Sequence, residues 1–138
     1  MYHRFNEDKY PSTNIKIDVF KKQLELIDKN NIEYYDPAKF DIEFKNPKTN
    51  KKILITIDDA FSSFYQNAWP ILKERKIPFI LFVSTEPVGK SGYMNWEQIK
   101  EVASYEFAYI GNHSHTHEYL LNFSYLEFEN DIKKSMKI

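Results

Sequence analysis

The sequence predicts an α/β protein in which parallel strands alternate with helices. Three strand-like segments are separated by helical patterns, and the run at 77–83, IPFILFV, is apolar throughout, as in a strand covered on both faces. The strand-like segments are 51–59, 77–83 and 106–113, and the helical patterns are 61–75, 95–104 and 124–138. This alternation favours a parallel sheet with helical crossovers, in which active sites gather at the carboxyl ends of the strands. A chain of 138 residues has room for one domain, so residues 1–138 are expected to form a single one.

A further helix is expected before the sheet, over about 19–30. Three apolar residues recur there at helical spacing, and Asp18 stands where a side chain can cap the first turn. The three residues are Phe20, Leu24 and Ile27. The polar segment 45–52, KNPKTNKK, predicts a connector between this helix and the first strand.

Local signals define the later helices. Within the helical pattern at 61–75, Pro70 cannot donate a hydrogen bond to residue 66, so a kink or a break is expected there. The next two helices each begin with a pair that can form a capping box. The pairs are Asn95 with Gln98 and Ser124 with Glu127.

Composition narrows the function classes. The net charge is -1 with 28% charged residues, so there is no electrostatic case for nucleic-acid binding. No run of about 18 apolar residues occurs, so no membrane span is expected. Without cysteine, a metal must be bound by histidine or carboxylate side chains. The opening MYHRFNEDKY has no signal-peptide pattern, which predicts a cytoplasmic location by default, and nothing predicts the oligomeric state.

Two aspartates, Asp58 and Asp59, end the first strand-like segment. Adjacent residues in a strand face opposite sides, but at a strand end the backbone can turn and present both. One carboxylate could then bind a metal ion while the other accepts a proton from water. The competing interpretation is a solvated pair, or a cap for the following helix.

Three of the four histidines lie within five residues, in GNHSHTHEYL at 111–120. On a continuing strand all three rings would share one face, whereas on a helical turn only residues i and i+4 lie together. The preceding strand ends at Gly-Asn, so we expect a turn that pairs His113 with His117 and directs His115 away. The competing interpretation is a surface histidine cluster with no ligand role.

Together, Asp59, His113 and His117 provide one carboxylate and two imidazoles, the three protein ligands of a hydrolytic zinc site. Such an ion would lower the pKa of a bound water towards ~7 and polarise a carbonyl oxygen. Asp58 would then act as the general base. Zinc (Zn²⁺) is favoured by the ligand types, although cobalt, nickel or iron could bind the same set.

These two stretches resemble the motifs of the polysaccharide deacetylase family, the carbohydrate esterases of family four, which remove N- or O-acetyl groups from sugar polymers. TIDDAF at 56–61 is similar to the first motif, Thr-Phe-Asp-Asp-Gly, and HSHTH at 113–117 is similar to the second, His-Ser/Thr-x-x-His. YHRF, YPST and ILKERKIPFILFV also look like this family, so the resemblance spans nearly the whole chain. It implies the base Asp58 and the metal ligands Asp59, His113 and His117.

The same resemblance implies an irregular (β/α) barrel and a loop supported by the Ser114 hydroxyl. Ala60 stands where the family has glycine, which is expected to tighten the turn after the aspartates. The family's later motifs are an Arg-x-Pro segment and a Leu-x-x-His segment that supplies the general acid. No candidate for them precedes the last residue, Ile138. We therefore expect an N-terminal portion of a deacetylase, apparently truncated after the second motif.

The leading hypothesis is a metal-dependent hydrolase that removes acetyl groups from an amino-sugar polysaccharide by cleaving a carbon–nitrogen bond. Its partner would be an acetylated carbohydrate polymer, and no substrate-binding residue is identified. The alternative is a truncated or degenerate domain that binds metal or carbohydrate without turnover. A His-x-His amidohydrolase is less favoured, because it would need His115 as a ligand and such a pair usually ends the first strand. His3 is expected to be an exposed terminal residue outside the site.

Overall fold

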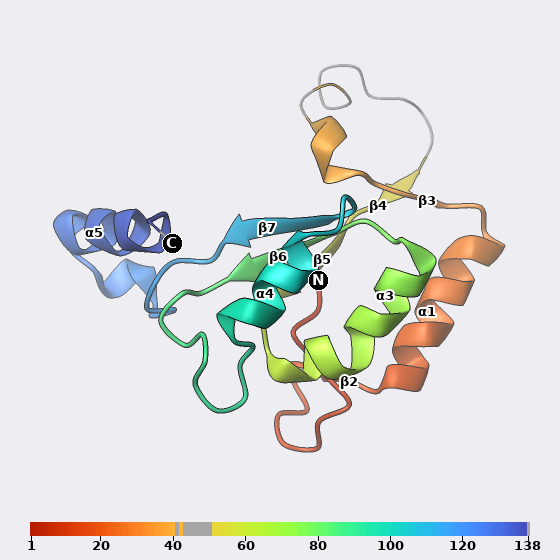
Figure 1. The fold of residues 1–138 in the computed structure, drawn as a ribbon, viewed down its shortest axis with the longest axis horizontal. Helices are drawn as coiled ribbons and strands as arrows, with labels where there is room; N and C mark the ends of the chain where they lie inside the picture. The colour runs from red at the N-terminus through yellow and green to blue at the C-terminus, as the bar shows by residue number, and fades with distance from the viewer. Residues whose placement is uncertain (41, 43–50, 138) are drawn as a thin grey trace.

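The computed structural model describes residues 1–40, 42 and 51–137, and the sheet at its centre is parallel, as predicted. Its strands lie in the order β5 (Ile55–Asp58), β6 (Phe79–Val83) and β7 (Ala108–Asn112) (Figure 1). The expected α/β class with parallel strands and helical crossovers is therefore confirmed. The predicted connector at 45–52 falls mostly outside the described residues.

Helices connect and flank the strands in the predicted order. The crossover from β5 to β6 ends in α3 (Trp69–Arg75), and α4 (Trp96–Ala103) links β6 to β7. α5 (Tyr125–Ser135) follows β7 and lies beyond the carboxyl ends of the strands (Figure 1). Short 3-10 turns are η1 (Pro37–Lys39) and η3 (Leu120–Asn122). Both predicted capping boxes are present, before α4 and before α5.

The first helix, α1 (Ile17–Lys29), begins earlier than expected, and the predicted cap by Asp18 is wrong. The N-cap residue is Lys16, and no side chain makes a capping hydrogen bond there. Asp18 lies inside the first turn instead, where its negative charge complements the positive end of the helix dipole.

Pro70 breaks the helical pattern between β5 and β6, as predicted. A π-helical segment, η2 (Phe64–Ala68), precedes α3, and the Trp69 amide bonds to the carbonyl of Phe64, five residues back. Pro70 then occupies the first turn of α3, where its missing amide leaves no helical bond unmade. The residues expected to form one kinked helix therefore form two segments with different hydrogen-bond periods.

Short parallel pairs were missed in the sequence, because two residues are too few to show a pattern. β1 (Arg4–Phe5) pairs with β2 (Asn14–Ile15), and β3 (Glu33–Tyr34) pairs with β4 (Lys52–Ile53). The prediction of one strand over 51–59 is therefore wrong: β4 joins β3, whereas β5 joins β6. The strand also stops before Asp59, whose φ of 73° is left-handed.

The N-terminal segment extends the sheet beyond β5. Tyr2 pairs with Ile57 in a parallel bridge. The Tyr2 amide donates to the Thr56 carbonyl at 2.8 Å, and the Asp58 amide donates to the Tyr2 carbonyl at 2.8 Å. Two reciprocal hydrogen bonds therefore place His3 next to the carboxyl end of β5.

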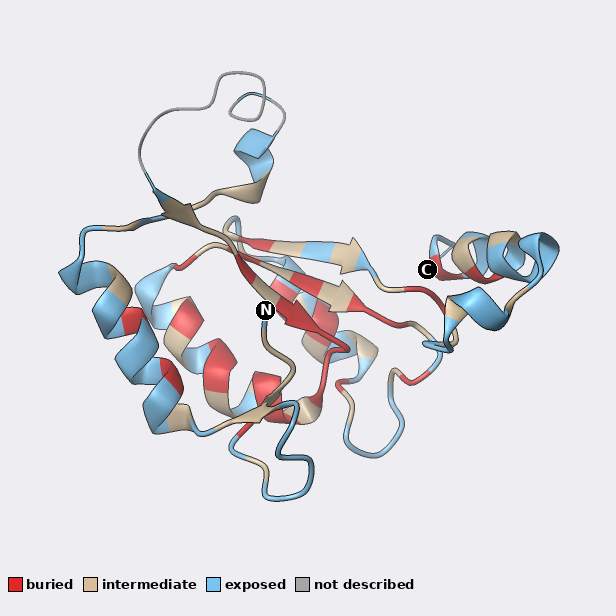
Figure 2. Ribbon diagram, turned by 180° about the vertical axis from the view of Figure 1, so that it is seen from behind, coloured by how far each residue is buried: buried red, intermediate tan, exposed pale blue. Residues whose placement is uncertain are grey.

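The two faces of the sheet differ. One face packs on the helices and forms the core, whose members include Ile57, Phe64, Leu72, Phe79, Leu81 and Val102. The other face carries no helix among the described residues (Figure 2). Strand register sets Asp58, Phe82 and Gly111 in one row on that face. The apolar run in β6 predicted burial on both faces, which is wrong, because Phe82 is only half-buried there.

No helix among the described residues is both long and apolar enough to cross a membrane.

Replacing Gly111 with alanine is expected to lower the free energy of unfolding by about 1–3 kcal/mol, the usual cost of overpacking. An added Cβ would lie 2.5 Å from Cε1 of Phe82 and 3.1 Å from Cγ2 of Ile80. Urea unfolding of the variant measures the change. As a control, the same replacement in a Phe82→Leu background should cost clearly less. An equal loss of unfolding free energy in both backgrounds would show that contact with Phe82 is not the cause.

Candidate active site

A left-handed turn follows β5 and separates the two aspartates. Asp58 is 8% exposed and Asp59 is 5% exposed. Asp59 and Ala60 have φ values of 73° and 53°, a region that costs a residue with a Cβ about 1–2 kcal/mol. Ala60 therefore adopts a conformation that glycine, the residue of the family motif, would adopt without this cost. It presents Asp59 to the histidine loop after β7.

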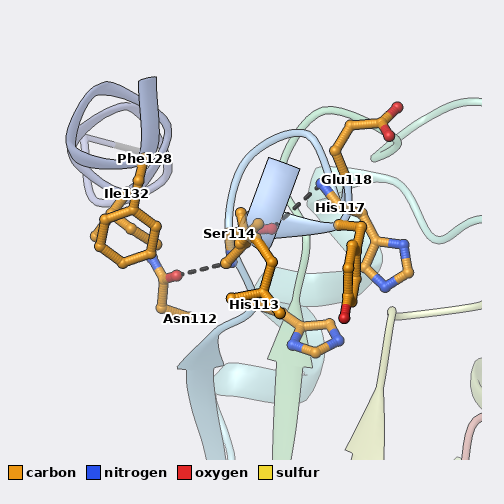
Figure 3. Close-up of a pocket in the computed structure, with 10 residues that line it drawn as sticks. Asn112, His113, Ser114, His117, Glu118, Phe128 and Ile132 are labelled. Carbon is orange, nitrogen blue, oxygen red and sulfur yellow. Dashed lines mark hydrogen bonds between the residues drawn. The ribbon is translucent and has the colours of Figure 1, made fainter. Parts of the chain in front are cut away.

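The histidine loop, residues 113–117, is not the helical turn that the spacing predicted. Ser114 and His117 have left-handed φ values of 68° and 60°. The Ser114 amide donates to Oδ1 of Asn112 at 2.9 Å, and the His117 amide donates to Oγ of Ser114 at 3.2 Å (Figure 3). The predicted pairing of His113 with His117 is nevertheless present, with ring centroids 5.1 Å apart. The Ser114 hydroxyl supports the loop, as the resemblance implied.

Asp59, His113 and His117 converge on one point. Oδ1 of Asp59 lies 3.2 Å from Nε2 of His113 and 2.9 Å from Nε2 of His117. One ligand atom from each residue lies within 4.8 Å of the other two. Around a tetrahedral zinc ion with bonds of ~2.0–2.1 Å, ligand atoms lie roughly 3.3 Å apart. The two distances from Asp59 to the imidazole nitrogens are close to that spacing.

The polar contacts of this cluster also fit a cation. Oδ1 of Asp59 is the single buried side-chain nitrogen or oxygen without a hydrogen-bond partner in the described part of the chain. Both imidazoles are close to it, but neither directs an N–H along a hydrogen-bond line. A buried carboxylate oxygen without a hydrogen bond, beside two ring nitrogens, is compensated when a positive charge lies close to it. A divalent metal ion with oxygen and nitrogen ligands supplies that charge.

The pKa shifts in the cluster favour an ionised Asp59 and a protonated His113. Burial raises the pKa of the Asp59 carboxyl, but contact with His113 and the charges of the surrounding histidines hold it below its usual value. Contact with Asp59 raises the pKa of His113 above its usual value. Asp59 is therefore available as an anionic ligand across the neutral pH range, while His113 must lose a proton before it can bind a metal.

His115 faces away from the cluster. It is buried, and its Nδ1 lies 2.7 Å from Oγ1 of Thr85, on the loop after β6. The cluster of possible metal ligands does not include it. This placement argues against the His-x-His amidohydrolase alternative, which needs His115 as a ligand.

His3 is partly buried beside Asp58, so the expectation of an exposed terminal residue is wrong. Its Nε2 lies 3.8 Å from Oδ2 of Asp58, and its side chain is 23% exposed. The pairing of Tyr2 with β5 puts it there. The sequence signal that could have found it is the histidine in the family-like YHRF.

The histidine loop is held from two sides. On the β6 side, Oγ of the fully buried Ser84 donates to the His113 carbonyl at 2.6 Å. On the α5 side, Asp131 is 6% exposed and accepts hydrogen bonds from the His115 and Thr116 amides at 2.7 and 2.9 Å. Burial raises the pKa of Asp131, but these bonds hold it below its usual value. Asp131 was not identified from the sequence.

A cavity of about 720 Å³ opens between this loop and α5 (Figure 3). Both candidate ligand histidines line it, and much of the remaining lining is apolar. The lining residues are Asn112, His113, Ser114, His117, Glu118, Tyr119, Leu120, Leu121, Phe128 and Ile132. A substrate approaching the histidines from this side would meet apolar and aromatic side chains.

Comparison with known proteins identifies the family. A polysaccharide deacetylase model matches residues 45–138. The Bacillus subtilis (strain 168) protein YxkH, which carries a polysaccharide deacetylase name, is 26% identical over 122 residues, covering 87% of this chain and 42% of that protein. The poly-beta-1,6-N-acetyl-D-glucosamine N-deacetylase of Staphylococcus aureus (strain MSSA476) is 30% identical over 103 residues, covering 72% of this chain and 36% of that protein.

Solved deacetylase structures superpose on this chain. IcaB from Ammonifex degensii superposes with a TM-score of 0.75 at 30% identity, covering 83% of this chain and 51% of that one. The Streptococcus pyogenes deacetylase PplD, solved with acetate, gives a TM-score of 0.84 at 23% identity, covering 98% of this chain and 63% of that one. The second likeness concerns the fold alone.

The chain therefore belongs to the polysaccharide deacetylase family, as its two motifs implied. Its βα units correspond to part of the barrel of these deacetylases, so the expected fold is confirmed. The chain spans less than half the length of the two curated relatives.

Zinc titrated calorimetrically into metal-free protein is expected to fill one site. His117→Ala should weaken binding by more than about 100-fold, because loss of a ligand costs more than the 10–100-fold typical of an outer contact. The matched control is His115→Ala, which removes a neighbouring imidazole outside the cluster and should keep the affinity within a few-fold. Loss of the site in His115→Ala, with retention in His117→Ala, would contradict the assignment.

Asp131 predicts a dependence of stability on pH. Because its folded-state pKa lies below the unfolded value of ~3.9, it stabilises the fold above that value and loses the effect as pH falls through the folded-state pKa. Asp131→Asn should therefore lower the free energy of unfolding by about 1–3 kcal/mol near neutral pH, and by less below about pH 4. Urea unfolding at several pH values tests this. A difference that stays constant down to acidic pH would contradict it.

Proposed function

We propose that this chain carries the metal ligands and the base of a hydrolase that removes acetyl groups from an amino-sugar polysaccharide. The observation that carries the proposal is the convergence of Asp59, His113 and His117 on one point, with Asp58 adjacent in the chain. The family and the deacetylase names of the relatives support the reaction class.

The cation is proposed to be zinc, held by one carboxylate oxygen and two imidazole nitrogens. When bound, it would polarise the acetyl carbonyl and acidify a water molecule. The ligand types favour zinc among divalent metals, and the unpartnered Oδ1 of Asp59 is the group that a cation would satisfy.

Asp58 is proposed as the general base. It lies at the end of β5 on the face of the sheet without helices, next to the ligand Asp59. Its carboxylate takes a proton from the attacking water, whose oxygen bonds to the acetyl carbon. Nε2 of His3 lies 3.8 Å from Oδ2 of Asp58. The carbon–nitrogen bond then breaks, and acetate and the protonated amine leave.

Protonation of the leaving amine needs an acid. The resemblance assigns this role to the family's Leu-x-x-His motif, which follows the histidine motif in the chain order of the family. The proposal therefore gives Asp58 the first proton transfer only. Poly-beta-1,6-N-acetyl-D-glucosamine, named for the Staphylococcus aureus relative, is the first polymer to test.

Asp58→Asn is expected to lower the rate of acetate release from acetylated glucosamine oligomers by about 10²–10⁴-fold, the usual contribution of a general base. Zinc affinity should stay within a few-fold, because Asp58 is not a proposed ligand. Glu118→Gln is the control: this exposed carboxylate lines the cavity next to His117, and its loss should leave the rate within about twofold.

Two outcomes would contradict parts of the proposal. An unchanged rate in Asp58→Asn would remove its role as base. Tight zinc binding by the unaltered chain, with no acetate release from any oligomer, would support the alternative of a metal-binding domain without turnover.

A further inference from the structure

The spacing of the two ligand histidines depends on a loop whose backbone is unusual. Ser114 and His117 both adopt left-handed φ values, which residues with a Cβ avoid unless their surroundings impose them. The loop contains neither glycine nor proline, so its own sequence does not impose this path. Contacts from outside the loop must therefore hold it.

One edge of the loop is bound to the segment after β6. The Thr85 amide donates to the Ser114 carbonyl at 3.3 Å, and the Glu86 amide donates to the His115 carbonyl at 2.9 Å. These bonds satisfy carbonyl oxygens only. The amides of His115 and Thr116, on the opposite edge, point towards α5.

On that opposite edge, Asp131 of α5 is the hydrogen-bond acceptor for both amides. Its Oδ1 accepts from the His115 amide at 2.7 Å, and its Oδ2 accepts from the Thr116 amide at 2.9 Å and from Oγ1 of Thr116 at 2.7 Å. The carboxylate is buried, so each bond is worth more than it would be in water. Both residues that it holds lie between His113 and His117.

A second contact from α5 reaches the start of the loop. Nδ2 of Asn112 donates to Oγ of Ser135 at 2.5 Å, while Oδ1 of Asn112 accepts from the Ser114 amide at 2.9 Å. Ser135 is buried on the same side of the helix as Asp131, one turn further on. α5 therefore contacts the loop through two residues, Ser135 and Asp131, and Asp131 is the charged residue of the two.

We propose that Asp131 is a positioning residue for the metal site: by fixing the peptides between His113 and His117, it sets the distance between the two imidazole ligands. The inference rests on the proposed function of this cluster as a metal site. Asp131 has no hydrogen bond to a ligand side chain; it acts through two backbone amides and the Thr116 hydroxyl. An asparagine in its place would put its side-chain NH₂ group opposite one of the backbone amides. Two donors would then face each other, the buried amide would have no acceptor, and the loop could relax.

Cobalt is the probe for the test, because its visible absorption reports the geometry of its ligands as well as its binding. Asp131→Asn should weaken cobalt affinity by about 10–100-fold, as loss of an outer-shell contact does, and should change the absorption spectrum. Asp131→Glu keeps an anionic acceptor and should recover part of the affinity. Ser124→Ala is the matched control, because it removes the cap of the same helix without touching the loop. It should lower thermal stability and leave both the affinity and the spectrum unchanged.

Amide exchange measured by nuclear magnetic resonance on metal-free protein gives a second readout. The His115 and Thr116 amide protons should be protected in the unaltered chain and exchange at least tenfold faster in Asp131→Asn. Fast exchange of both in the unaltered chain would overturn the proposal. So would an affinity and spectrum in Asp131→Asn that match the unaltered chain, or an equal loss in Ser124→Ala. If the unaltered chain protects both amides but binds no cobalt, the metal site itself fails, and the positioning role falls with it.

Discussion

Oδ1 of Asp59 is buried, faces the nitrogens of His113 and His117, and has no hydrogen-bond partner among the described residues. A buried carboxylate without compensation costs several kcal/mol, so the fold must either neutralise it or supply a positive charge. Two imidazoles supply that charge when protonated, and a divalent cation supplies it when they are neutral. The turn after β5 and the histidine loop after β7 bring these three groups together.

That path is strained. Asp59, Ala60, Ser114 and His117 are all left-handed residues with a Cβ, and all four lie at the cluster or beside it. Such residues persist only where the surrounding structure determines their conformation, and they gather at functional sites. Here the surroundings are the parallel sheet, which fixes the start of both loops, the buried Ser84 on one side and Asp131 on the other. We therefore infer that the histidine loop depends on α5 as well as on the strands that precede the ligand residues.

The sequence was sufficient for the parts of the fold that depend on local pattern. The alternation of strands and helices, the two capping boxes and the break at Pro70 were predictable. The proximity of Asp59, His113 and His117 was also predicted, although the loop that pairs the two histidines is not the expected helical turn. Contacts between distant segments were not. His3 reaches Asp58 through pairing of Tyr2 with β5, and Asp131 reaches the loop across 16 residues. The spacing of apolar residues does not predict either contact. The left-handed turns were not predicted, because the residues in them are not glycine.

X-ray absorption at the zinc edge of the zinc-loaded chain identifies the atoms bound to the ion and so tests whether Asp59, His113 and His117 bind it. We expect one zinc per chain, surrounded by two imidazole nitrogens with oxygen atoms completing the shell. A spectrum that requires three imidazoles, or a single one, would contradict the assignment of Asp59, His113 and His117. So would failure of the folded chain to retain zinc.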